Sequence, residues 1–339
     1  SFRLKFPATM VSPTLTVVTF YTEGPPHDDC SPLGEVADEL RGLLEARGVN
    51  LVAYTQRQLA DDDYYRRHCL AKQPEEEEPG MELLPNACKL GYYAWKPLVI
   101  CKALSKLQPG EMLLFMDANI RKYPDYKEGI EDLPHVCASL LKACGSDIFV
   151  PLEDAVWKRI RNHCKNYTLE LMDADTFDVA YAPCVCVNRI LMRRTEQVEC
   201  IMHDWLNWCS QAVVISPLPN PNPHPLSLFH TPEQSILAIL LRKRVLCGEL
   251  PAGWPFFSYA EGGRVFHTRT LERWPMTPWR RARRRLYYML WFLKHVLGAF
   301  SYPKRHWFWK QFPRATPGYL LKFALRGAIM CLTPLPGAC

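Results

Sequence analysis

The sequence has no Cys-x-x-Cys pair, although it contains 14 cysteines. Cysteines paired at that spacing are typical of zinc knuckles and thioredoxin-like redox motifs, so their absence argues against both. Most of the cysteines stand in apolar runs, for example Cys101, Cys184 and Cys247, where a thiol packs as a small hydrophobic side chain. The even number permits disulfides, but the spacing does not define their pairing.

The sequence also has no uninterrupted apolar run of the length that a membrane-spanning helix needs. The longest approach to one, residues 286–300, carries Lys294 and His295 and favours an interfacial or packed amphipathic helix. At its start the sequence shows no charged segment followed by an apolar one, as a signal peptide would have. We therefore expect a cytoplasmic or peripheral-membrane protein.

Positive charge is unevenly distributed. The formal net charge of +6 combines an acidic run at residues 75–78 with a basic, aromatic last quarter in which five arginines fall within residues 280–285. We predict a catalytic-type domain at residues 1–278 and a helical basic appendage at residues 279–339. Its basic residues and tryptophans suit an anionic membrane surface, contacted through residues 279–310. Two other interpretations stay open: a solvated helix face, and a nucleic-acid surface, which we favour less.

The order of the predicted elements indicates an α/β fold. A β-branched strand at 15–20, a helix at 35–47 and a strand at 50–54 form a β-α-β unit, which predicts a mixed, mainly parallel sheet flanked by helices. Residues 56–86 are polar and are interpreted as a surface excursion. Further elements are expected along the chain: helices at 92–107, 135–142 and 191–209, strands at 111–116, 147–151, 182–188 and 213–216, and a helix that begins after Thr231.

The clearest local signal for chemistry is the apolar strand Glu111–Met116, which runs directly into Asp117-Ala118-Asn119. Ligands of open α/β sheets bind at the carboxyl ends of strands. Two oxygen ligands at i and i+2 can hold a divalent cation there, and the cation can neutralise a diphosphate. The alternative is an aspartate that only caps the turn after the strand.

Several short segments, in this order along the chain, resemble the GT-A (Rossmann-like) nucleotide-sugar glycosyltransferases, in particular glycogenin-like and lipooligosaccharide galactosyltransferase-like retaining enzymes. They are GYYAWKP at 91–97, LLFMDAN at 113–119, HTPEQSIL at 230–237 and RVFH at 264–267. Asn119 and Glu233 each stand where the family commonly has an aspartate. The resemblance covers roughly residues 14–270 and does not explain the appendage.

The resemblance implies transfer of a hexose from a nucleotide-diphosphate sugar, with a UDP-sugar favoured, to a hydroxyl of a glycan or protein acceptor. It assigns Glu233 and Gln234 to the reacting sugar, and it implies a Mn²⁺ or Mg²⁺ cofactor. The implied donor-binding residues are Thr19, Tyr21, Lys96, Asp117 and His230. The implied metal ligands are Asp117, Asn119 and His267.

Other interpretations of the same residues remain open. Glu233 could be part of a helix cap, Lys96 could only pack the start of its helix, and His267 could be a structural hydrogen-bonding residue. The departures at Asn119 and Glu233 also fit a GT-A-like binding or scaffold protein without activity. A nucleotidyltransferase would need a glycine-rich basic loop after the first strand, whereas residues 24–29 are acidic. The sugar, the base, the acceptor and the stereochemical outcome are not defined by the sequence.

Overall fold

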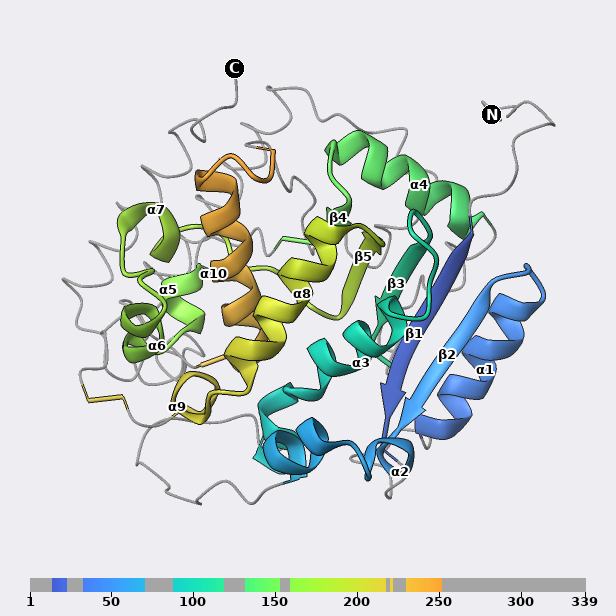
Figure 1. Cartoon of the computed structure of the whole chain (residues 1–339), viewed down its shortest axis with the longest axis horizontal. Helices are drawn as coiled ribbons and strands as arrows, with labels where there is room; N and C mark the ends of the chain where they lie inside the picture. The colour runs from blue at the N-terminus through green and yellow to red at the C-terminus, as the bar shows by residue number, and fades with distance from the viewer. Residues whose placement is uncertain are drawn as a thin grey trace, which may run out of the picture.

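The computed structural model describes residues 14–22, 33–70, 88–118, 132–152, 159–217, 220–221 and 230–251. In this part of the chain the architecture is α/β, with one five-stranded sheet and helices on both of its faces (Figure 1). This confirms the predicted fold class at the level of a mixed α/β sheet. The predicted domain boundary at residue 278 and the basic appendage lie outside the described residues.

The sheet has the strand order β2-β1-β3-β5-β4. Strands β1, β2 and β3 are mutually parallel where they pair, whereas β5 runs antiparallel to both of its neighbours. The sheet is therefore mixed and mainly parallel, as the β-α-β pattern predicts. The strands are β1 (Leu15–Tyr21), β2 (Asn50–Thr55), β3 (Met112–Met116), β4 (Ile148–Phe149) and β5 (Arg189–Arg193).

Alternate residues of the central strands divide the core into two layers. Val17 of β1 and Leu114 of β3 belong to the layer under the helices α1 and α4, and Val18 and Phe115 belong to the layer under α3, α8 and α10. Because both faces are covered, β1 and β3 are apolar almost throughout. The long helices are α1 (Leu33–Glu45), α3 (Trp95–Leu104), α4 (Leu133–Cys144), α8 (Glu196–Cys209) and α10 (Pro232–Leu246).

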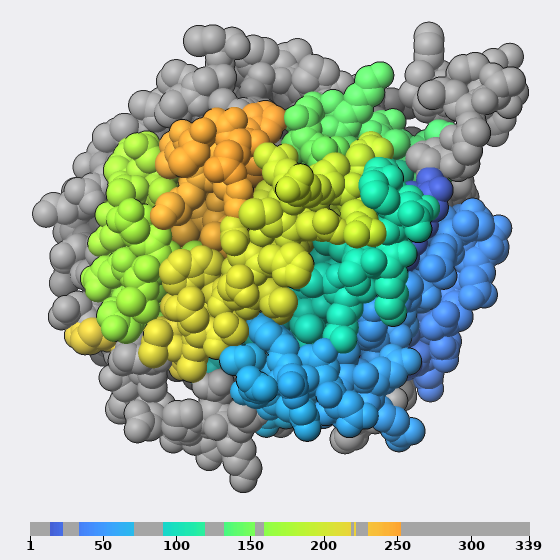
Figure 2. All heavy atoms as spheres, in the orientation of Figure 1, coloured from blue at the N-terminus to red at the C-terminus, as the bar shows by residue number. Residues whose placement is uncertain are grey.

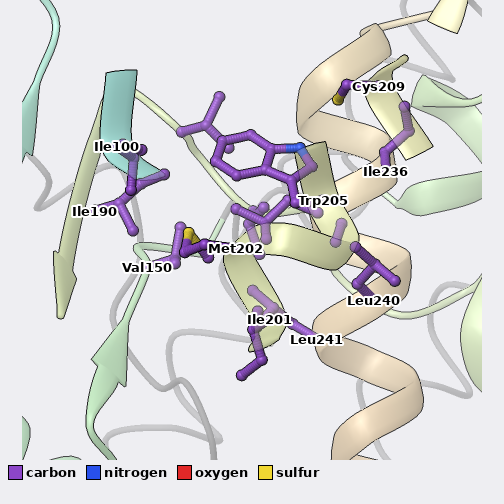
Figure 3. Close-up of a cluster of buried hydrophobic side chains, with 14 of the residues drawn as sticks. Ile100, Val150, Ile190, Ile201, Met202, Trp205, Cys209, Ile236, Leu240 and Leu241 are labelled. Atoms are coloured by element: carbon purple, nitrogen blue, oxygen red, sulfur yellow. The ribbon is translucent and has the colours of Figure 1, made fainter. Parts of the chain in front are cut away.

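Among the described residues, Trp205 of α8 is the largest fully buried side chain. Figure 3 shows it between Ile100 of α3 and Ile236 of α10, so that one indole ring joins three helices. Its indole nitrogen donates a hydrogen bond of 2.9 Å to the backbone oxygen of Glu233. The core thus fixes the position of the first turn of α10, where the predicted site residues lie.

One predicted strand in the middle of the chain is misplaced, and the helix after it is confirmed but starts later than expected. The expected strand at 182–188 forms only isolated bridges, Val185 with Leu152 and Pro183 with Arg159, and the strand is instead β5. The expected helix at 191–209 begins at Glu196 as α8. Residues 182–192 are mostly buried, and a short apolar run does not reveal by periodicity which part of it pairs with a neighbouring strand.

The polar segment after β2 is not a surface excursion over its first part. Leu59, Tyr65 and Cys69 are buried in the core, and only residues 71–87 lie outside the described residues. The strand expected at 213–216 is instead the short helix α9. The short helices are α2 (Gln56–Leu59), the π-helix η1 (Tyr65–Leu70), the 3-10 helix η2 (Cys88–Tyr93), α5 (Ile160–His163), α6 (Asn166–Leu171), α7 (Phe177–Ala180) and α9 (Ala212–Ile215).

Helices α8 and α10 lie side by side on the face of the molecule that Figure 2 presents, with α5 to α7 beyond α10 and the β2–α1 edge on the other side. Within the described ranges, none of the helices combines the length and the apolar character that crossing a membrane requires.

Candidate functional site

Asp117 lies directly beyond the carboxyl end of β3, as the sequence predicts. Its backbone nitrogen donates a hydrogen bond of 2.9 Å to the oxygen of Asn188, which continues the pairing of β3 with β5 by one residue. By the alternation of the strand it shares a face with Phe115, and therefore with α3 and α10. Its side chain is 31% exposed. Asp117 is thus a carboxylate fixed by the sheet and still open to a ligand.

Lys96, the second residue of α3, connects Asp117 to α10. The residue is only 5% exposed. Its Nζ lies 3.1 Å from Oε1 of Glu233 and 3.5 Å from Oδ1 of Asp117. A buried ammonium needs paired charges, and these two carboxylates supply them. We call Lys96, Asp117 and Glu233 the lysine–carboxylate cluster.

Glu233, the second residue of α10, is the buried acid of the cluster, with 4% exposure. Burial raises the pKa of its carboxyl above the ordinary value, the Lys96 ammonium opposes that rise, and Asp117 adds to it. Burial alone would lower the pKa of Lys96, but the two carboxylates outweigh it and the pKa is raised. Lys96 therefore stays charged, and the cluster carries one net negative charge when both acids are ionised.

A left-handed turn before α3 places Lys96 beside Asp117 and Glu233. Gly91, Tyr92 and Tyr93 have φ values of 58°, 52° and 65°. A Cβ on Gly91 would come within 2.0 Å of the backbone oxygen of His68, so only glycine fits against η1. Helix α3 starts two residues after this turn. Gly91 and Tyr93 belong to the GYYAWKP motif, but the sequence analysis assigned them no role. The close approach of η1 to Gly91 is visible only in the folded chain.

Gln234 follows Glu233 on α10 and is half-buried. Its Nε2 lies 3.6 Å from Sγ of Cys184, a contact with a weak sulfur acceptor. The amide therefore keeps most of its hydrogen-bonding capacity within the described part of the chain. The two residues predicted to contact the reacting sugar therefore differ: Glu233 is a buried acid bound to Lys96, whereas Gln234 is a more accessible amide.

His230 does not join the cluster. Its Nδ1 accepts a hydrogen bond from the backbone nitrogen of Lys165 at 3.3 Å, and its Nε2 donates to the backbone oxygen of Val214 at 3.1 Å. Burial, followed by the nearby Lys165 ammonium, lowers the pKa of His230 to about 3, so the ring is neutral. Both ring nitrogens are used by backbone groups. His230 therefore holds the start of α10 in place, and neither of its ring nitrogens is left for the predicted contact with the donor.

Thr19 and Tyr21 of β1 lie on the other face of the sheet, with Val17 and away from α3. Thr19 is fully buried, and its Oγ1 has no hydrogen-bond partner among the described residues. The ring of Tyr21 packs near Gly34 at the start of α1. The β1 residue on the side of the cluster is Phe20, which stacks on Trp95 with ring centroids 4.3 Å apart. The structure thus places neither predicted residue beside Lys96.

Asn119 and His267, two of the three predicted metal ligands, lie outside the described residues. Within the ranges that the structure describes, no three His, Cys, Asp or Glu side chains form a metal-ligand group. Asp117 suits a divalent cation, because it is a partly exposed carboxylate at a strand end.

Comparison of the chain with protein-family models, curated proteins and solved structures found no match.

Proposed function

We propose that this chain is a transferase acting on nucleotide-diphosphate sugars, and more narrowly a hexosyltransferase with a GT-A-type site that uses a glycan or protein hydroxyl as acceptor. The observation that carries the proposal is the lysine–carboxylate cluster. Three predicted motifs meet there, because both Asp117 and Glu233 lie within ion-pair distance of Lys96. Removing the charges of Lys96 and Glu233 from water is costly, and buried charged groups with shifted pKa values are concentrated at functional sites.

The position of the cluster in the sheet supports the proposal. It lies at the carboxyl end of β3, a central strand parallel to β1, which is the edge where open α/β sheets bind ligands. The antiparallel strand β5 pairs with β3 on the other side and ends the parallel run beside Asp117. The sheet is therefore consistent with a GT-A fold, and the resemblance of the motifs supplies the finer assignment.

The charge of the cluster bears on the predicted cofactor. With one cation and two acids the cluster would repel a diphosphate, so a donor of this class needs further positive charge. Asp117 fits a Mn²⁺ or Mg²⁺ ligand by its exposure, and Asn119 and His267 are the other residues that we propose to hold the ion. When bound, the ion would supply charge for the diphosphate as it leaves.

Three described side chains have proposed roles in binding the donor and in the transfer: Lys96, Glu233 and Gln234. Lys96 offers a fixed positive charge to the diphosphate, because its raised pKa keeps it protonated. Glu233 orients Lys96 through their ion pair, and the more accessible Gln234 lines the reacting face. The anomeric carbon–oxygen bond to the diphosphate breaks as the bond to the acceptor oxygen forms, and the acceptor proton passes to the departing diphosphate. Preorganised charge of this kind is the main source of rate enhancement in such sites.

A combined thermal-shift and donor-hydrolysis assay on the full chain tests the proposal. UDP-, GDP- and dTDP-hexoses are each compared with Mn²⁺, Mg²⁺ or EDTA, for wild type and for Asp117→Asn. We expect one donor to raise the melting temperature and to be hydrolysed slowly. In Asp117→Asn we expect hydrolysis to fall by about a hundredfold or more. Asp61→Asn, which changes an exposed aspartate outside the cluster, is the matched control.

The outcomes separate the alternatives. Loss of the response in EDTA would support the metal, and a response that survives EDTA would leave the transferase in place and remove the cofactor from it. No response of wild type to any donor would contradict the transferase and favour the inactive scaffold. Equal hydrolysis by wild type and Asp117→Asn would show that the cluster is not the site.

A further inference from the structure

Tyr93 has a backbone conformation that its own packing does not explain. Its φ of 65° lies in the left-handed region, where the Cβ of a bulky residue crowds the following carbonyl oxygen. Gly91 in the same turn has a steric reason to be there, and Tyr92 is buried in the core. Tyr93 is only half-buried. Strain of this kind persists where the surrounding structure enforces it, and it concentrates at ligand-binding sites.

The ring of Tyr93 borders the lysine–carboxylate cluster. Its centroid lies 5.1 Å from Nζ of Lys96, within cation–π range. The ring of Tyr93 also meets the ring of Trp95 edge to face, at 64° and with centroids 6.2 Å apart. Burial raises the pKa of the Tyr93 phenol, the carboxylates of Glu233 and Asp117 add to that rise, and the Lys96 ammonium opposes it. Tyr93 is therefore a partly exposed aromatic side chain beside the lysine–carboxylate cluster.

We propose that Tyr93 is a substrate-contacting residue that binds the sugar ring of the donor. This inference rests on the proposed function and adds the residue that recognises the sugar. The flat face of a tyrosine suits the C–H groups of a pyranose, and its hydroxyl can exchange hydrogen bonds with a sugar hydroxyl. The nearby, partly exposed carboxylate of Asp117 offers a further acceptor for hydroxyl groups. A phenol carries no positive charge, so it does not suit the diphosphate, for which Lys96 is the fitting group.

Binding of a nucleotide sugar compared with its nucleoside diphosphate tests the inference, measured by calorimetry on the full chain. UDP-glucose and UDP-galactose are compared with UDP, or the equivalent pair for whichever donor stabilises wild type. Tyr93→Phe removes only the hydroxyl and is expected to weaken binding of the nucleotide sugar about fivefold. Tyr93→Asn also removes the ring and is expected to weaken it about fiftyfold. Both variants are expected to bind the nucleoside diphosphate within about twofold of wild type, because the sugar contact is absent there.

The controls separate recognition from folding. Asparagine tolerates a left-handed backbone, so Tyr93→Asn keeps the turn, and Tyr93→Phe keeps the ring. Tyr92→Phe makes the same hydroxyl deletion at the neighbouring buried tyrosine and is expected to leave both affinities unchanged. Wild-type affinity of Tyr93→Asn for the nucleotide sugar would overturn the inference. An equal loss for the nucleoside diphosphate would overturn it too, since Tyr93 would then bind the nucleotide. Failure of wild type itself to bind any nucleotide sugar would remove the proposed function, and the sugar contact with it.

Discussion

Asp117 and Glu233 are acids of the same charge that the fold places in different environments. Asp117 is 31% exposed at the end of β3, whereas Glu233 is 4% exposed within the first turn of α10. A carboxylate open to solvent can exchange water for a cation or a substrate, and a buried one mainly holds its neighbour in place. The two acids therefore have different expected effects: loss of Asp117 should act on ligand binding, and loss of Glu233 on Lys96 and on stability.

Lys96 gives the first prediction. In Lys96→Met the buried carboxylate of Glu233 loses its cation, and we expect the free energy of unfolding to fall by about 3 kcal/mol at pH 7. Urea denaturation measures the change. Donor-dependent stabilisation should disappear in the same variant, since the fixed charge for the diphosphate is gone.

A double-mutant cycle separates the ion pair from the loss of the lysine side chain. Lys96→Met combined with Glu233→Gln removes both charges, so the double variant should lose less stability than the sum of the two single variants. The reason is that most of the cost in each single variant comes from the charge that is left buried and unpaired. Strict additivity of the two changes would show that Lys96 and Glu233 do not interact in the folded protein.

At the scale of elements, the position of α3 depends on how closely η2 approaches η1. Gly91 has φ of 58°, and a Cβ there would meet three backbone atoms of His68 and Cys69, the nearest at 2.0 Å. Backbone atoms cannot move aside as the end of a flexible side chain can. The turn therefore tolerates no side chain at Gly91, and through it η1 determines where Trp95 and Lys96 lie.

Gly91→Ala gives the second prediction. We expect it to destabilise the protein by about 3 kcal/mol or more, because the strain of a left-handed alanine is added to a steric clash. Gly110→Ala is the matched control: its φ is 88°, but no atom lies within 4 Å of the added Cβ, so only the backbone strain of about 1–2 kcal/mol applies. Thermal and urea unfolding of both variants measure the difference. Equal destabilisation would mean that η1 and η2 do not pack as closely as the structure shows.

At the scale of the whole molecule, several elements are joined through His230. Its ring links α10 to the backbone at Lys165 and at Val214, while Thr231 donates two hydrogen bonds to the backbone oxygen of His163. Thr231 precedes α10 as predicted, but its hydroxyl serves this contact and makes no capping hydrogen bond to its own helix. The start of α10 is therefore fixed by tertiary contacts.

The acid stability of the protein gives the third prediction. The folded pKa of His230 is lowered to about 3 from an unfolded value near 6.5, so between these values the unfolded chain binds a proton that the folded one does not. Stability contributed by the neutral ring is thus complete above pH 6.5 and is lost as the pH falls towards 3. Between pH 7 and pH 5 we expect His230 to cost about 2 kcal/mol of unfolding free energy.

Urea denaturation at a series of pH values measures this slope. His230→Gln cannot be protonated, so its unfolding free energy should depend less steeply on pH in this range, although it starts lower. His203→Gln, which changes an exposed histidine on α8, should keep the wild-type slope. An identical slope in His230→Gln would show that the acid sensitivity arises elsewhere.

Much of the sheet was predictable because local pattern and tertiary role agree in it. Strand β1, helix α1 and strand β2 follow from apolar spacing and from Gly48, and β3 follows from an apolar run that ends at an aspartate. The prediction was wrong at α9, and it was wrong at β5, where the apolar residues on both sides of the turn are buried. There the hydrogen bonds of β5 to β3 and β4 decide the outcome, and a sequence window contains none of those partners.

By itself the sequence determined the α/β class, the strand end at Asp117 and the helix that begins beside Glu233, because these depend on residues adjacent in the chain. Only the tertiary structure decided that Lys96 is buried between the two acids, that Tyr93 borders them, and that His230 is occupied by backbone groups. The ion pairs of Lys96 and the hydrogen bonds of His230 join segments far apart in the chain, and close packing of the helices on one face of the sheet selects them. The charges of a site are visible in a sequence, whereas their burial and pairing arise when the chain folds.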